Sequence, residues 1–433
     1  MKAKTNPPTT AREPVIKTDS RPMGDGPTLT GLDVLQRNDF RQLKGKRAAL
    51  LTNHTAINRE SVNILDLMTS HPNVKLVALF SPEHGLFGNV DTQVEDFHNT
   101  RTGLMVYSLY TARKDPNLKA HHPRPQDLKG IDVVVIDMQD IGARFYTYSG
   151  YMGNMMEECG KLGVEVMVLD RPNPIGGLYV DGPLTDDDLV GAVTSYFKMP
   201  IAHGMTMGEM AMMFNAENKL GCKLTIVQAQ NWTRDMCFDQ TGLRWVNPSP
   251  NIQDLDAALA YPGIAMTERN VSMGRGTTEP FHLFGTPFID DPRGMCDEIN
   301  KSGLVTGARI EAADFTPTGT LARQHIGEGK TCRGGRIIIT DRRKFRPVAL
   351  GVSVMTYLCA KYGEKYVPQK TSAGVKTAPQ YDVMQLRGLT SAVLCARIRE
   401  KVSAENNLKF IDQQVAHFLP IRAKYLLYPE KKP

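Results

Sequence analysis

Residues 74–88, VKLVALFSPEHGLFG, decide the fold of this 433-residue chain. The stretch begins with β-branched and apolar residues and almost no charge, which is typical of a strand buried on both faces of a parallel sheet. Pro82 has no backbone N–H to give to a neighbouring strand, so the strand must stop there. Glu83 and His84 therefore stand on a turn past the carboxyl end of the strand, the edge at which open α/β sheets bind ligands.

Similar apolar runs recur through the first half of the chain. Strands are predicted over residues 46–52, 74–80, 105–110, 131–137, 164–169 and 224–229, and helices over 61–69, 151–161 and 208–216. Strands that alternate with helices at this spacing predict βαβ units and an α/β fold with a doubly wound parallel sheet.

Four of these strands end in polar residues at the same relative position. The polar residues are Asn53 and His54, Glu83 and His84, Asp137 with Asp140 and Arg144, and Asp170 with Arg171. Parallel strands place their carboxyl ends on one edge of a sheet, so side chains distant in the sequence should converge on one cleft.

The length of the chain predicts two domains. Residues 1–28 are rich in proline, threonine and charge, and predict a disordered N-terminal arm. Residues 245–251, WVNPSPN, hold too many prolines for regular structure, so we place the boundary just after them, between domains over 29–252 and 253–433. In the second half, strands over 335–340 and 348–354 and helices over 392–403 and 407–418 predict a smaller α+β domain.

Composition argues against several classes of protein. The formal net charge of +6 is spread along the chain and aromatics are not interleaved with basic clusters, so no nucleic-acid partner is expected. The seven cysteines lie far apart without a CxxC pair, which indicates neither a disulfide framework nor a thiolate zinc site. No apolar run approaches the roughly 18 residues of a membrane span. No secretory leader is visible, so the compartment is cytoplasmic, or periplasmic or extracellular if a leader was removed. The oligomeric state is not indicated.

Six motifs together carry a resemblance to a known family: SPEHG (81–85), DMQDIGARFYTY (137–148), LDRPNP (169–174), HGMTMGE (203–209), WVNPSPN (245–251) and NVSMGRGTTEPF (270–281). In this order they resemble the exo-β-N-acetylmuramidases, a family of peptidoglycan glycoside hydrolases, over about residues 31–428. The resemblance implies a Rossmann-like first domain, a smaller α+β domain and a cleft between them. It also implies release of N-acetylmuramic acid from the non-reducing end of peptidoglycan fragments.

The chain departs from the family pattern at two places in its second half. We would expect one more residue between Glu268 and Asn270, and an acidic residue at the position of Met273. The loop of the second domain is therefore expected to bind its ligand differently, which affects the role of Glu268 more than that of Glu83.

Hydrolysis of a glycosidic bond needs a proton for the leaving oxygen, commonly supplied by one of two carboxyl groups. We predict that Glu83 is the acid, because a turn beyond a buried strand can desolvate its carboxyl group enough to hold a proton near neutral pH. The alternative interpretations are a helix cap or an ion pair with an arginine.

The partner of Glu83 stays open between three carboxyl groups and the substrate itself. Asp137, Asp140 and Glu268 are the candidates. Asp137 could instead accept hydrogen bonds from the next loop, and Asp140 could orient Arg144 or a sugar hydroxyl. In a third route, the 2-acetamido oxygen of the substrate attacks the anomeric carbon while a carboxylate holds the acetamido N–H.

N-acetylmuramic acid carries a lactyl carboxylate, and a guanidinium group matches a carboxylate with two hydrogen bonds. Arg144, Arg171 and Arg275 are candidates for this contact, although an internal ion pair would explain each of them as well. The other predicted substrate-binding residues are Asn53, His54, His84, Tyr146, Asp170 and Asn270. His203 and Ser249 are expected to brace turns.

Two other classes of function fit part of the pattern. Two domains around a cleft also describe a non-catalytic muropeptide-binding protein. A metal-dependent hydrolase could use His54, His84 and Asp137, but no HxH or HExxH spacing favours it, so no metal is expected. The glycine-rich stretches 274–276 and 327–331 lack the spacing of phosphate-binding loops, so neither a nucleotide nor another cofactor is expected.

Overall fold

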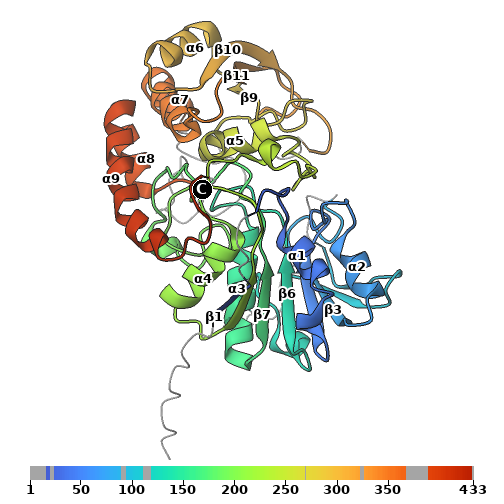
Figure 1. Ribbon diagram of the computed structural model, residues 1–433. Coiled ribbons are helices and arrows are strands. Elements are labelled where there is room, and N and C mark those ends of the chain that lie inside the picture. Colours follow the sequence, from blue (N-terminus) through green and yellow to red (C-terminus); the bar gives the residue numbers. More distant parts are fainter. Residues whose placement is uncertain are drawn as a thin grey trace, which may run out of the picture.

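The computed structural model describes residues 16–19, 24–88, 94–110, 119–268, 270–321, 326–366 and 389–431. They form a large, mainly parallel sheet with helices on both faces, followed by a small antiparallel sheet with its own helices (Figure 1). The predicted α/β fold with a smaller α+β part is thereby confirmed.

The large sheet has eight strands: β1 (Ile16–Asp19), β2 (Arg47–Thr52), β3 (Lys75–Ser81), β4 (Phe97–His98), β5 (Met105–Ser108), β6 (Val133–Asp137), β7 (Glu165–Leu169) and β8 (Lys223–Val227). Six of them run parallel in the order β5-β3-β2-β6-β7-β8, which is the order of a doubly wound Rossmann sheet. At one edge β4 pairs antiparallel with β5. At the other edge β1 pairs in parallel with β8.

Strand β1 lies within the arm for which the sequence predicted disorder. An edge strand is held by main-chain hydrogen bonds to its neighbour, which do not require an apolar pattern in its own sequence. Residues 1–15 and 20–23 of the predicted arm lie outside the described residues.

Alternate residues of the central strands enter two separate cores. Leu50, Leu79 and Val135 pack with α1 (Gly31–Arg37) and α2 (Ile64–Ser70) on one face. Their sequence neighbours pack with α3 (Tyr148–Leu162) and α4 (Met207–Glu217) on the other. Each fully buried Leu, Ile or Val contributes roughly 1.5–3 kcal/mol. Burial on both faces therefore explains why these strands are uniformly apolar in sequence.

The second half contains β9 (Leu283–Thr286), β10 (Ala308–Phe315) and β11 (Cys332–Ile339), with α5 (Leu255–Ile264), α6 (Pro292–Lys301), α7 (Pro347–Tyr362), α8 (Ala392–Arg399) and α9 (Ala404–Ala423). The strand predicted over residues 348–354 is wrong, because these residues lie in α7. A short apolar run does not distinguish a buried strand from a buried helix. Pro347 in the first turn was the available signal, since proline favours that position of a helix.

Single turns of 3₁₀-helix connect several of these elements: η1 (Arg41–Leu43), η2 (Pro125–Leu128), η3 (Asp187–Leu189), η4 (Phe238–Thr241), η5 (Ala265–Thr267) and η6 (Gly363–Lys365). Among the described residues, no helix is both long and apolar enough to cross a membrane.

Helices α5 and α7 approach each other closely at a pair of glycines. A Cβ atom on Gly263 would lie 1.7 Å from the carbonyl oxygen of Pro347, and one on Gly351 would lie 2.3 Å from the carbonyl oxygen of Gly263. Only glycine permits this contact, which fixes α5 between the small sheet and the large one (Figure 1).

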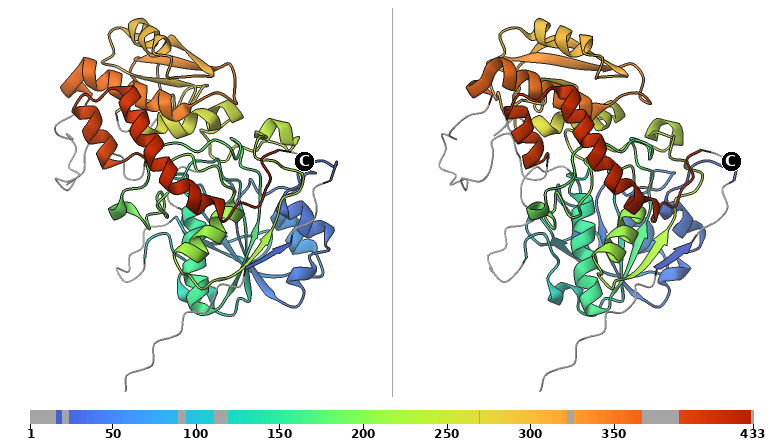
Figure 2. Two further views of the ribbon diagram at one scale, coloured as in Figure 1. Left: turned by 60° about the vertical axis from the view of Figure 1, so that its left-hand side comes forward. Right: turned by 90° about the vertical axis from the view of Figure 1, so that its left-hand side faces the viewer.

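The last helix and the segment after it return to the first domain (Figure 2). Arg422 near the end of α9 donates hydrogen bonds to the carbonyl oxygens of Gly177 and Gly204. Further on, the Tyr428 hydroxyl donates to Asp170 Oδ2 at 2.6 Å. The carboxyl-terminal segment thus ties the two domains together.

Asp170 accepts hydrogen bonds from Tyr428, from the Thr206 hydroxyl and from the backbone N–H groups of Arg171 and Gly208. Asp170→Ala should lower the free energy of unfolding by at least about 3 kcal/mol, since each buried donor left unpaired costs about 1–3 kcal/mol. Chemical denaturation followed by circular dichroism measures the loss.

Two tyrosine variants test whether the loss of stability is specific to the Asp170 network or would follow from removal of any tyrosine hydroxyl. Tyr428→Phe removes one buried donor and should cost about 1–3 kcal/mol. Tyr425→Phe removes only an exposed hydrogen bond to Glu217 and should have little effect. Equal effects of the two substitutions would contradict a special role for Asp170.

Candidate active site

The order of the strands in the large sheet indicates where the site lies. The chain runs outward from β2 through β3 to β5, and then returns to the other side of β2 to form β6, β7 and β8. Connections leave β2 and β6 in opposite directions, and open α/β sheets bind ligands beyond the strand ends at such a point. The strands with polar ends, β3, β2, β6 and β7, are consecutive neighbours in the sheet, so their carboxyl ends lie next to one another at one edge.

Glu83 stands on a tight turn two residues after the end of β3. His84 has a φ of 68°, which side chains rarely adopt, and Gly85 follows at 71°. The Gly85 N–H closes the turn on the Pro82 carbonyl oxygen at 3.1 Å. A non-glycine residue in this conformation strains the backbone, and such strain is found mainly at functional sites.

The Glu83 carboxylate is anchored by one hydroxyl group. Thr147 Oγ1 donates a hydrogen bond to Oε2 at 2.8 Å. In the described part of the chain, no arginine forms an ion pair with Glu83 and no helix starts at its turn. The structure thus supports neither of the alternative interpretations given above.

Four tyrosines surround this carboxylate: Tyr146, Tyr148, Tyr151 and Tyr261. Burial raises the pKa of each hydroxyl above its usual value, and the negative charge of Glu83 raises it further. The rings of Tyr146 and Tyr148 meet edge to face at 4.7 Å, and the nearby Asn53 amide nitrogen is buried without a hydrogen-bond partner among the described residues. All four remain neutral phenols, and a phenol has one proton to donate. The Tyr148 hydroxyl gives its proton to the Pro248 carbonyl oxygen, whereas the Tyr146 hydroxyl has no partner among the described residues and can donate to a sugar oxygen.

His54 is held in one tautomer. Its Nε2 lies 2.8 Å from the Asn247 carbonyl oxygen, so Nε2 carries the proton and donates. Burial lowers the pKa of His54, and the nearby His84 contributes, so the ring is neutral at pH 7. Nδ1 is then an acceptor, and it is buried without a partner among the described residues. A Cβ on Gly88 would lie 1.8 Å from the ring, so this glycine allows the ring its place.

Asp140 lies in the loop after β6. One of its carboxylate oxygens is hydrogen-bonded, and the other has no partner among the described residues. Oδ2 accepts the Gly142 N–H at 2.7 Å and lies 3.4 Å from His203 Nε2. His203 Nδ1 accepts the Met205 N–H, which turns Nε2 toward Asp140. Oδ1 is buried with no hydrogen-bond partner in the described residues. His203, predicted only to brace a turn, thus also contacts a site carboxylate.

The second domain adds Glu268 and Arg275. Arg275 donates to Glu268 Oε1 at 3.1 Å and lies over the Phe281 ring. Phe281 meets Tyr261 of α5 edge to face at 4.9 Å. Burial raises the pKa of Tyr261, and among the further influences are the charges of Glu268, Glu83 and Asp140. Tyr261 therefore lies where groups from both domains meet.

Asp137 and Arg171 form a buried ion pair with each other. Arg171 Nε and Nη2 donate to the two oxygens of Asp137 at 2.5 and 2.9 Å. Arg171 also donates to the Ile57 carbonyl oxygen. With both carboxylate oxygens bound, Asp137 has a structural role in this arrangement, and Arg171 is not available to a lactyl carboxylate.

Asp170 and Arg144 are likewise occupied by the protein. Asp170 is fully buried in the hydrogen-bond network described above. Arg144 donates to the carbonyl oxygens of Pro183, Met199 and Thr390 at 2.6, 2.6 and 3.0 Å. Arg144 thus fastens three chain segments, and the expectation that Asp140 orients Arg144 finds no support.

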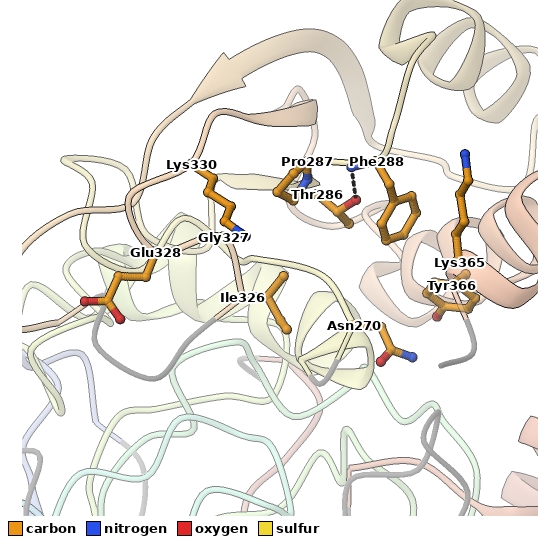
Figure 3. Close-up of a pocket in the computed structure, with 10 residues that line it drawn as sticks. All are labelled: Asn270, Thr286, Pro287, Phe288, Ile326, Gly327, Glu328, Lys330, Lys365 and Tyr366. Atoms are coloured by element: carbon orange, nitrogen blue, oxygen red, sulfur yellow. Dashed lines mark hydrogen bonds between the residues drawn. The ribbon is translucent and has the colours of Figure 1, made fainter. Parts of the chain in front are cut away.

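Asn270 and Met273 belong to the loop that departs from the family pattern. Asn270 lines a cavity of about 570 Å³ on the second domain (Figure 3). Met273 is 2% exposed and packs in the apolar core, so its side chain does not reach the cleft. Arg269, between Glu268 and Asn270, lies outside the described residues.

Asn251 is a polar residue that sequence reasoning missed. It is 1% exposed, and neither its amide oxygen nor its amide nitrogen has a partner among the described residues. Three residues earlier, the Pro248 carbonyl oxygen accepts the Tyr148 hydroxyl. A buried amide without partners costs about 1–3 kcal/mol, which is typical of a group kept for a ligand. Its place in the motif WVNPSPN was the available signal.

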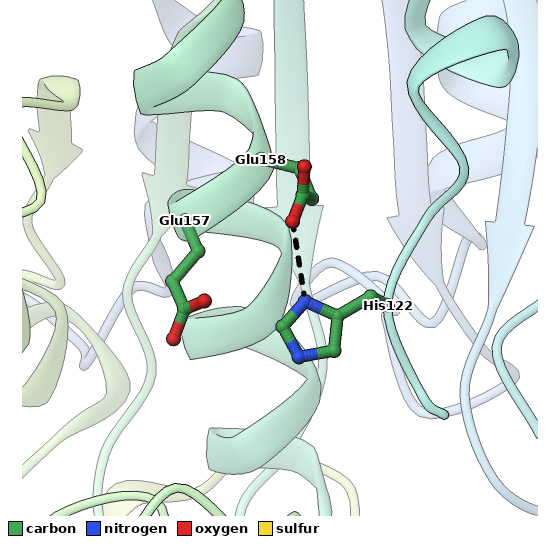
Figure 4. Close-up of side chains that lie close together, drawn as sticks. All are labelled: His122, Glu157 and Glu158. Carbon is green, nitrogen blue, oxygen red and sulfur yellow. Dashed lines mark ion pairs between the residues drawn. The ribbon is translucent and has the colours of Figure 1, made fainter. Parts of the chain in front are cut away.

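One other cluster has metal-binding residue types. His122 lies beside Glu157 and Glu158 of α3 (Figure 4). Lys161 binds Glu158 at 2.7 Å and Lys119 lies 3.6 Å from Glu157, so both carboxylates have cationic partners already. This arrangement fits an ion-pair network that holds the 119–122 segment against α3.

Comparisons with known proteins agree over nearly the whole chain. Family models described as the N-terminal and C-terminal parts of exo-β-N-acetylmuramidase NamZ match residues 48–256 and 259–428. The peptidoglycan β-N-acetylmuramidase NamZ of Bacillus subtilis (strain 168) is 37% identical over 402 residues, covering 92% of this chain and 91% of that protein.

Two crystal structures of DUF1343 family proteins from Bacteroides fragilis NCTC 9343 have the same fold. One has a TM-score of 0.81 at 32% identity and covers 93% of this chain and 99% of its own. The other has a TM-score of 0.69 at 28% identity and covers 94% of this chain and 100% of its own.

The Asp137–Arg171 pair makes a specific prediction. Asp137→Asn leaves a buried guanidinium without its counter-charge and should lower the free energy of unfolding by about 3–5 kcal/mol. The double variant Asp137→Leu with Arg171→Met removes both charges and should recover most of this loss. Urea denaturation measures both, and unchanged stability of Asp137→Asn would contradict the structural role.

For Asn251 we expect the opposite effect, a substitution that increases stability. Asn251→Leu keeps the side-chain volume and removes an unpartnered amide, so the unfolding free energy should rise by about 1–3 kcal/mol. Asn247→Leu, at an exposed position in the same segment, is the control and should be near neutral. A loss of stability in Asn251→Leu would show that the amide is satisfied in the folded protein.

Proposed function

The chain belongs to the exo-β-N-acetylmuramidase NamZ family of glycoside hydrolases, and from this premise we propose that it releases N-acetylmuramic acid from the non-reducing end of peptidoglycan fragments, with Glu83 as general acid. The observation that carries the assignment is the Glu83 carboxylate itself. It stands at the reversal of the sheet, held by Thr147 and ringed by neutral tyrosines.

The hydrogen bond from Thr147 makes the two carboxylate oxygens of Glu83 inequivalent. Because Oε2 accepts the Thr147 hydroxyl, Oε1 is the oxygen that carries the proton when Glu83 acts as an acid. From there it passes to the glycosidic oxygen as the bond to the anomeric carbon breaks. Tyr146 holds a sugar hydroxyl, and the rings of the surrounding tyrosines exclude water from the acid.

Asp140 is the second carboxylate in this proposal. Asp137 is bound by Arg171 and Glu268 by Arg275, whereas Asp140 Oδ1 has no protein partner in the described residues. Direct attack on the anomeric carbon requires such an oxygen, and so does holding the acetamido N–H while the acetamido oxygen attacks. The Gly142 N–H holds the other oxygen of Asp140 and so orients Oδ1.

Arg275 is the arginine best placed for the lactyl carboxylate. Its Nη2 binds Glu268, but its Nε is buried without a partner among the described residues. A guanidinium group with an unused N–H donor can bind a second carboxylate by donating a charge-assisted hydrogen bond to it. His54 Nδ1 and the Asn251 amide supply further contacts to the sugar ring.

Glu83→Gln tests the acid. Hydrolysis of the disaccharide N-acetylmuramyl-β-1,4-N-acetylglucosamine should fall about 10²–10⁴-fold in kcat, the usual contribution of general acid catalysis. A substrate with a 2,4-dinitrophenyl leaving group needs no proton and should lose much less. Product release is measured by chromatography, and dye release by absorbance.

Glu60→Gln, an exposed carboxylate on another loop, is the matched control and should keep wild-type rates on both substrates. Equal losses on the two substrates would remove Glu83 from the role of acid. Undiminished turnover of the disaccharide would remove Glu83 from the mechanism altogether.

A further inference from the structure

We propose that the cavity beside Asn270 binds a carboxylate of the peptidoglycan fragment, on the leaving-group side of the cleaved bond. This inference rests on the proposed function, and it gives the second domain a role in choosing the length or decoration of the substrate. The cavity holds about 570 Å³, enough for part of a sugar residue with its lactyl group.

The interior of this cavity combines polar and aromatic groups. Asn270, Thr286 and Tyr366 are buried in its wall, and Phe288 adds a second ring (Figure 3). Aromatic surface with a few fixed polar groups is the usual composition of a ligand site. The Thr286 hydroxyl accepts the Phe288 N–H at 3.1 Å, which fixes that turn of the wall.

Two lysines give the cavity its charge. Lys330 and Lys365 line it, and neither forms an ion pair among the described residues. Figure 3 shows the Lys330 side chain turned toward the other lining residues, whereas the Lys365 ammonium group points away from Asn270 and Tyr366, and its charge also acts on Asp290. Figure 3 shows Glu328 turned away from the other lining side chains, so its charge does not neutralise them locally. Exposed cations beside a polar cavity favour an anionic ligand.

The cavity adjoins the active site through a single loop. Glu268 and Arg275 of this loop influence Tyr261, which also lies within the field of Glu83. Asn270, two residues after Glu268, lines the cavity. Ser272 of the same loop exchanges hydrogen bonds with Gly285, next to Thr286 of the cavity wall. A saccharide leaving the cleft along this loop would therefore reach the cavity.

The leaving N-acetylglucosamine carries no carboxylate, so the anion must come from farther along the fragment. Two sources share this chemistry: the lactyl carboxylate of the next muramyl residue, and the carboxylates of a stem peptide attached to it. A lysine ammonium binds either through charge-assisted hydrogen bonds.

Three substrates distinguish these sources: the disaccharide, the peptide-free tetrasaccharide MurNAc-GlcNAc-MurNAc-GlcNAc, and the same tetrasaccharide with a stem peptide on its inner muramyl residue. Lys330→Gln should raise KM for a carboxylate-bearing substrate about tenfold, the loss expected for one charge-assisted hydrogen bond. Lys365→Gln should raise it less, because its ammonium group points away from Asn270 and Tyr366. Both should leave disaccharide hydrolysis unchanged. Sensitivity confined to the peptide-bearing substrate identifies the peptide as the source.

Lys301→Gln, at the exposed end of α6, is the control and should change none of the three reactions. Calorimetric binding of each tetrasaccharide to Glu83→Gln, with and without Lys330→Gln, tests the cavity without turnover. If wild-type protein fails to cleave the disaccharide, the proposed function fails while the calorimetry still reports on the cavity. Equal affinity and equal KM in the lysine variants for every substrate would overturn the inference.

Discussion

The parallel pairing of β2 with β3 on one side and β6 on the other is the constraint on which the rest of the structure depends. It sets the point where the strand order reverses, and hence where a crevice must open. Because β3 is the immediate neighbour of β2, the turn with Glu83 lies beside Asn53 and His54. Because β6 is the other neighbour, Asp140 faces the same crevice. The chemistry follows from the order of the strands.

Among the buried polar groups at this edge of the sheet, hydrogen-bond partners distinguish those with a structural role from those that we propose bind a ligand. Asp137, Asp170 and Arg144 are buried and have protein partners for their side-chain atoms. His54, Asp140 and Asn251 each bury at least one atom without a partner in the described residues. Unpaired buried groups are costly, so they persist where a ligand supplies the missing contact. On this contrast, more than on residue type, rests our proposal that these three groups face a substrate.

The second domain completes the site through contacts that are unusually close. Helix α5 can carry Tyr261 toward Glu83 because Gly263 and Gly351 let α5 and α7 touch. Helix α9 and the segment after it return to the first domain, where Tyr428 joins the Asp170 network. The position of the loop with Glu268, Asn270 and Arg275 relative to the sheet is therefore fixed from two directions.

The sequence by itself determined the six parallel strands from β2 to β8, their ends and the family, because apolar period, proline and short motifs are local signals. Glu83 could be found in this way, since Pro82 must end β3. Only the tertiary structure decided which polar residues remain available: Asp137 and Arg171 are 34 residues apart, and their pairing is visible only once β6 and β7 are adjacent. The same holds for residues 348–354, whose apolar run fitted a strand until packing against α5 made it part of α7. Hydrogen bonds and close packing join residues distant in sequence, so no local pattern specifies them.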